Sequence, residues 1–142
     1  MESIADTSRL LQQAGVIDHR RPDDATLLAW HELLAPYSLR DCLDALRAHR
    51  TESTEYLQPA HIIGRVRAVQ RRRLLAVPAE ANPDVEADYP AACRALARAI
   101  RDGVLSRADY EAYLDGTDPA EVVIRRARQR AVQGGAARGE LR

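Results

Sequence analysis

The chain has 142 residues, of which 46% are hydrophobic and 4% aromatic, and it contains no phenylalanine. This length holds one small domain, or a small domain with an appended helical segment, and excludes a large core. The 21 basic and 21 acidic residues give a net charge of zero, which excludes a strong overall attraction to nucleic acid or to a membrane. A core of Leu, Ile, Val and Ala suits helix-on-helix packing, so we expect an all-α protein.

The first expected helix runs from Ser3 to Ala14 and ends at Gly15, a residue type that favours helix C-termini. A charged connector follows. The second helix begins near Asp24, with Asp23 as an acidic cap at its positive end. This helix carries Trp30, the only tryptophan of the chain.

The spacing of apolar residues around Trp30 predicts that its side chain is buried. Its helical face is expected to hold Leu27, Leu33 and Leu34. A third helix over residues 39–49 begins after Ser38, and it presents Leu39, Cys42, Leu43 and Leu46 on one face. We therefore interpret Trp30 as a core anchor rather than a binding residue.

After a polar loop over residues 50–58, Pro59 opens a fourth helix with an apolar stripe and a run of arginines. No acidic residue lies between Ile62 and Val77. The candidate nucleic-acid-binding residues are Arg65, Arg67, Arg71, Arg72 and Arg73. Such arginines can neutralise phosphates, but the same pattern is also typical of the solvated outer face of an amphipathic helix.

Residues 76–90 are rich in proline and acidic side chains, which predicts a linker. We expect a compact four-helix N-terminal domain over residues 1–75 and a smaller helical segment over residues 91–133. That segment should contain helices over 91–101, 106–114 and 118–132, and residues 134–142 should form a flexible tail. Ser106, with Asp109 three residues later, is expected to start the second of these helices.

The last helix has more apolar and cationic surface than a solvated tail requires. The residues expected to contact a partner are Val122, Val123, Ile124, Arg126 and Arg130. Packing of this helix on the two preceding helices explains the same pattern, and both alternatives stay open.

No recognised catalytic or cofactor motif is present in the sequence. A phosphate-binding loop needs a lysine after its glycines, and the chain has none. The four histidines and two cysteines lack the spacing of a metal site. We therefore expect a protein that is not an enzyme, with no cofactor, no metal and no small-molecule substrate. No segment approaches the length of a membrane span, so we expect a cytoplasmic protein.

One series of residues resembles the phage replicative helicase loader and inhibitor family. It comprises an acidic cap, Leu-Leu-Ala-Trp30-His-Glu-Leu-Leu, Tyr37, Asp41, Ala45-Leu46, a polar loop, and Leu57-Gln-Pro59-Ala-His-Ile62-Ile63. The resemblance covers about residues 4 to 73. It implies a non-enzymatic replication adaptor in the host bacterial cytosol. Such an adaptor binds a replicative DNA helicase, restrains it and helps to load it at the origin, where an initiator protein is a further partner.

Two other functions remain open at this point. The chain can be a DNA-binding replication or regulatory protein that uses the arginines of the fourth helix. It can also be a phage protein that captures an unrelated host factor, which the sequence does not separate from a helicase adaptor.

Overall fold

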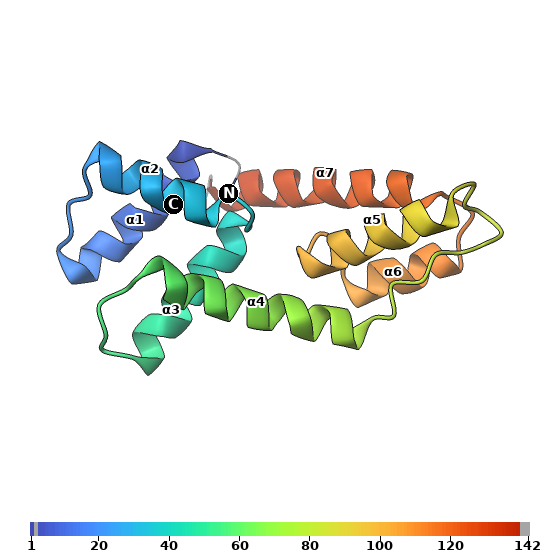
Figure 1. Ribbon diagram of the computed structural model, residues 1–142. Coiled ribbons are helices and arrows are strands. Elements are labelled where there is room, and N and C mark those ends of the chain that lie inside the picture. Colours follow the sequence, from blue (N-terminus) through green and yellow to red (C-terminus); the bar gives the residue numbers. More distant parts are fainter. Residues whose placement is uncertain (2, 140–142) are drawn as a thin grey trace. The chain divides into compact units, whose positions relative to one another are not determined.

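Residues 1 and 3–139 are described by a computed structural model, in which they form seven α-helices and no β-strand (Figure 1). The helices are α1 (Ile4–Asp18), α2 (Asp24–Leu34), α3 (Leu39–Glu52), α4 (Pro59–Ala76), α5 (Tyr89–Arg101), α6 (Arg107–Leu114) and α7 (Ala120–Gly139). The prediction of an all-α protein is thus confirmed for the described residues. None of these helices combines the length and the apolar character that a membrane span requires.

The chain divides into two compact units, which we call the N-terminal unit (Met1–Val69) and the C-terminal unit (from Gln70 onward). The division falls inside α4, six residues before the expected domain end at residue 75. The expected flexible tail is helical as far as Gly139, and its last residues, 140–142, lie outside the described part of the chain.

In the N-terminal unit, α1 packs against both α2 and α3. Trp30 is 7% exposed and lies in the core with Leu34 and Leu46, as its spacing predicts. Leu33 is 52% exposed, so its predicted place on this face is wrong. Successive residues of a helix point about 100° apart. Leu34 is therefore buried in this core, and Leu33 turns towards solvent.

Side-chain caps begin α2 and α3 at the predicted residues. Asp23 accepts a hydrogen bond from the backbone of Thr26 at 2.8 Å, and Ser38 accepts one from the backbone of Asp41 at 3.1 Å. Each cap satisfies an N–H group that the helix itself leaves unpaired.

The end of α1 differs from its prediction. The helix continues past Gly15 to His19, which ends it in the left-handed conformation at φ 55°. A Cβ atom on Gly15 would lie 2.8 Å from the carbonyl oxygen of Arg20. The glycine is therefore required by the close return of the chain after α1, and not by the helix end itself.

In the C-terminal unit, α7 packs against α5 and α6, and residues 77–88 belong to the same core. Val77 and Ala81 are buried. The hydroxyl of Tyr110 donates to the carbonyl of Glu80 at 2.8 Å, and that of Tyr113 donates to the Glu86 carboxylate at 2.8 Å. The stretch predicted to be a linker thus contributes packing and hydrogen bonds to the C-terminal unit.

Two carboxylates organise the starts of α6 and α7. Asp109 and Ser106 form a reciprocal capping box at the start of α6. The Glu86 carboxylate accepts a hydrogen bond from the backbone of Ala120, the first residue of α7, at 2.6 Å. A negative charge at this end of a helix is stabilised by the helix dipole.

Candidate functional site

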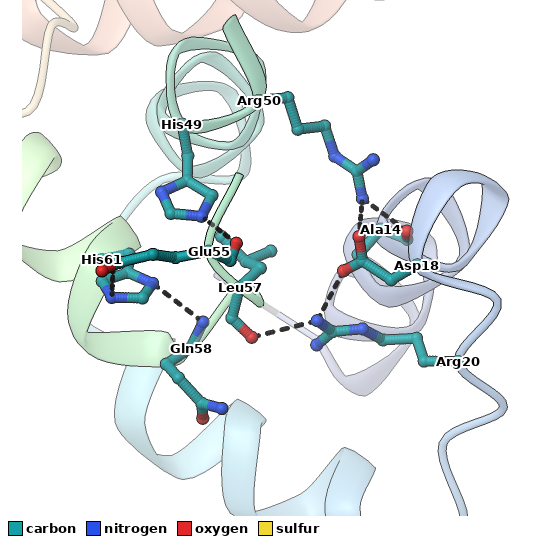
Figure 2. A network of polar contacts seen from close by, with 9 residues as sticks. All are labelled: Ala14, Asp18, Arg20, His49, Arg50, Glu55, Leu57, Gln58 and His61. Atoms are coloured by element: carbon teal, nitrogen blue, oxygen red, sulfur yellow. Dashed lines mark hydrogen bonds and ion pairs between the residues drawn. The ribbon is translucent and has the colours of Figure 1, made fainter. Parts of the chain in front are cut away.

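Two arginines of the N-terminal unit share one aspartate in a largely buried network (Figure 2). The Nη2 atom of Arg20 donates to Asp18 at 2.6 Å and to the carbonyl of Leu57 at 3.0 Å. The Nη2 atom of Arg50 donates to the carbonyl of Ala14 at 2.5 Å and lies 3.4 Å from Asp18. These contacts tie the end of α1 to α3 and to the loop before α4.

The network is closed to ligands. The Arg20 guanidinium lies over the ring of Tyr56 at 4.2 Å and over Trp30 at 5.4 Å, which adds cation–π attraction. Nε of Arg20 and Nε and Nη1 of Arg50 have no hydrogen-bond partner among the described residues and are shielded from solvent. Because no ligand can reach these atoms, we assign the network to the fold.

Two histidines stack beside this network, and both serve the loop before α4 (Figure 2). Their ring centres are 4.6 Å apart and the planes differ by 14°. Buried His49 donates from Nε2 to the carbonyl of Glu55 at 2.9 Å. Nδ1 of His61 accepts the backbone N–H of Gln58 at 3.1 Å. His61 therefore closes the start of α4 as an acidic residue does in a capping box.

The first two arginines of α4 have contacts within the N-terminal unit. Arg65 forms an ion pair with Glu52 at 2.7 Å. Nε of Arg67 lies 3.0 Å from the hydroxyl of Tyr37, to which it donates. Both groups are only partly available to a phosphate.

The last three arginines of α4 belong to the C-terminal unit. Arg73 is half-buried and donates to the carbonyl of Arg101 at 3.0 Å, next to Gly103. Arg71 and Arg72 are exposed, and neither makes a hydrogen bond or an ion pair within the described residues. The run of five predicted nucleic-acid contacts therefore contains two uncommitted cations.

The three apolar residues predicted to contact a partner lie at different depths in α7. Ile124 is 7% exposed and belongs to the core of the C-terminal unit. Val122 and Val123 are half-buried, and Val123 packs against the same core. Most of this apolar surface is used inside the unit, which leaves Val122 and Val123 partly open.

The two arginines of the predicted partner site reach back towards α6 and the turn before α7. Arg126 forms an ion pair with Asp118, and Arg130 pairs with Asp109 at 2.5 Å. The arginine side chains are 58% and 61% exposed, whereas those of Asp118 and Asp109 are 48% and 28% exposed. The cations therefore lie nearer to solvent than the anions that hold them.

A cleft of about 190 Å³ opens between these two ion pairs. Its apolar lining consists of Ala112, Tyr113, Gly116 and Val123, and the paired arginines and aspartates complete it. Three of the five residues predicted to contact a partner thus line one cleft. We call this site the α6–α7 cleft.

The charge of Asp109 is fixed by its surroundings. Burial raises the pKa of this carboxyl, but hydrogen bonds from Ser106 and the charge of Arg130 outweigh it, and the net pKa lies below the ordinary value. Asp109 is therefore ionised at neutral pH and holds Arg130 over the cleft.

Sequence reasoning did not identify the α6 side of this cleft. The Ser106 and Asp109 pair was recognised as a helix start, but the second contact of Asp109 joins residues 21 positions apart, which no local pattern reveals. Within the described residues, no group of three or more His, Cys, Asp or Glu side chains is arranged to hold a metal ion. Comparison of the chain with models of protein families, with curated proteins and with solved structures found no match.

Proposed function

We propose that the chain is a non-enzymatic adaptor that binds a replicative DNA helicase, restrains it and helps to load it at the origin, with an initiator protein as a further partner. The α6–α7 cleft is the proposed helicase contact. The observation that carries the proposal is the cleft itself, where exposed guanidinium groups of Arg126 and Arg130 flank an apolar floor.

This combination is typical of protein interfaces. Their energy comes from a few apolar or arginine anchors that fill pockets, and the surrounding polar rim adds orientation. The choice of a helicase rests on the resemblance of residues 4–73 to phage helicase loaders. The cleft supports protein binding, and the resemblance supplies the partner to test first.

The test is co-purification of the host's replicative helicase with the full-length chain at low salt. Replacing Arg126 and Arg130 together by glutamine should weaken retention by at least about tenfold. The matched control variant carries glutamine at Arg94 and Arg98, two exposed arginines of α5. This variant should retain the helicase. No retention by the unaltered chain, or equal loss in both variants, contradicts the proposal.

Point variants are preferable to removal of all residues after Pro90. Such a truncation would remove the core residues that pack against Val77 and Ala81, and both side chains would become exposed. Loss of binding would then report unfolding of the C-terminal unit rather than loss of a contact.

A second candidate function is DNA binding, which the uncommitted guanidinium groups of Arg71 and Arg72 favour. Fluorescence anisotropy with labelled duplex and single-stranded DNA should show binding that weakens as salt rises. Changing both arginines to alanine should reduce it, while the same change at exposed Arg9 and Arg40 should not. Absence of binding at low salt removes this candidate.

A further inference from the structure

We propose that the α6–α7 cleft receives an apolar side chain from an acidic segment of a partner protein. The inference rests on the proposed function, because it gives the chemistry of the partner at the same site. It does not depend on the partner being a helicase.

The size and lining of the cleft fit one apolar side chain. Its volume is about 190 Å³. An apolar protein cavity of about 150 Å³ is large enough for benzene. Ala112 and Gly116 leave the space open on the α6 side, and half-buried Val123 forms the α7 side. A leucine or phenylalanine side chain can therefore enter without displacing the core.

The surface around the cleft selects an acidic partner. The Arg126 and Arg130 side chains on its lining are 58% and 61% exposed, and the sequence has no acidic residue between Glu121 and Glu140. Carboxylates of the partner can approach these guanidinium groups from solvent, because both side chains are more exposed than the aspartates with which they pair. Complementary charge then orients the segment as it docks.

The apolar part of the lining argues against a nucleic acid in this cleft. Ala112, Tyr113, Gly116 and Val123 offer no cation to a phosphate, whereas they match an aliphatic or aromatic side chain. Protein is therefore the occupant that the geometry favours.

The experiment uses the full-length chain and a fluorescein-labelled synthetic peptide in which glutamates surround one central leucine. Anisotropy should detect binding at low salt, and a peptide with serine in place of the leucine should bind about tenfold more weakly. Ala112→Leu fills the cleft and should weaken binding of the leucine peptide by about tenfold. The control Ala108→Leu adds the same side chain to exposed α6 surface outside the cleft and should leave the affinity within about twofold.

A pair of charge variants separates the cleft from a general charge effect. Asp118→Asn frees Arg126 and should strengthen peptide binding by about threefold. Asp115→Asn makes the same change in net charge at an exposed position outside the cleft and should have a smaller effect. Circular dichroism of each variant checks that its helices are intact.

Three results would overturn the inference: equal binding of the leucine and serine peptides, equal effects of Ala112→Leu and Ala108→Leu, or displacement of the peptide by a single-stranded oligonucleotide at equal charge concentration. If these occur while helicase capture still depends on Arg126 and Arg130, the inference fails and the proposed function stands. If the peptide binds as expected and no helicase is retained, the helicase assignment fails and the inference stands.

Discussion

Replacing Asp18 by asparagine should destabilise the N-terminal unit by about 3 kcal/mol. The carboxylate is the only anion in the network with Arg20 and Arg50 in the part of the chain that the structure describes. The change removes one negative charge and leaves two guanidinium groups facing each other across a neutral amide.

The magnitude follows from burial and geometry. The side chains of Arg20, Arg50 and Asp18 are 8%, 15% and 17% exposed, and the two N···O distances are 2.6 and 3.4 Å. Removing one partner of a buried ion pair costs about 3–5 kcal/mol. Asparagine keeps one oxygen that can accept from Arg20, so we expect the lower end of this range.

Urea unfolding followed by tryptophan fluorescence measures the effect in the correct unit, because Trp30 is the only tryptophan and lies in the core of the N-terminal unit. The matched control is Asp44→Asn. Asp44 pairs with Arg47, but these side chains are 58% and 66% exposed. Solvent screening limits this pair to about 0.5 kcal/mol.

A double-mutant cycle with Arg50→Met tests the reasoning further. This change also removes two buried N–H groups that lack partners, so it should cost less than Asp18→Asn. In the Arg50→Met background only Arg20 depends on the carboxylate, so Asp18→Asn should cost less there than alone. A cost below about 1 kcal/mol for Asp18→Asn, or strict additivity of the two changes, would refute the shared-carboxylate account.

Three further predictions concern individual side chains. Burial raises the pKa of the Cys42 thiol to about 11, so iodoacetamide should modify half-buried Cys93 first in the folded chain. Peptide mass spectrometry measures the modification rate of each cysteine, and equal rates would contradict this prediction. Burial, together with the hydrogen bond to Glu86, raises the pKa of Tyr113 from 10.0 to about 12, so its neutral form stabilises the C-terminal unit below pH 10 and this contribution is lost as the pH rises towards 12. Thermal melts between pH 9 and pH 11, values about one unit on either side of an ordinary tyrosine pKa, should therefore fall more steeply for the unaltered chain than for Tyr113→Phe. Gly103→Ala should destabilise the C-terminal unit by about 1 kcal/mol because Gly103 has φ 71°, and faster amide exchange in α5 is the measurable sign.

The sequence predicted where helices start more accurately than where α1 ends. Asp23, Ser38 and Ser106 cap helices at the predicted positions, because a side chain that accepts from an N–H two or three residues on is a local signal. The end of α1 depends instead on the path of the chain as it returns past Gly15. That path is set by contacts between residues far apart in sequence.

The composition of residues 76–90 was a poor guide to their role. Prolines and acidic side chains are typical of linkers, but a hydrogen-bonded acid can serve a core as well. Two buried tyrosines of α6 need partners for their hydroxyl groups, and residues 80 and 86 supply them. Two tyrosines in a chain with few aromatic residues indicate buried hydroxyl groups that need hydrogen-bond partners. The sequence does not identify those partners, because they lie about 30 positions away.

The arginines show why a candidate site could be predicted only in part. Sequence identifies runs of cations, but it does not tell which of them already have an anion or a carbonyl inside the fold. Arg73 is bound to the end of α5, and Arg65 is bound to Glu52, whereas Arg71 and Arg72 make no such contact within the described residues. In α7, pairing does not remove Arg126 from solvent, because its side chain is still 58% exposed when it pairs with Asp118. The useful quantity for a binding surface is therefore the exposed side of each guanidinium, and the number of arginines in a run does not give it.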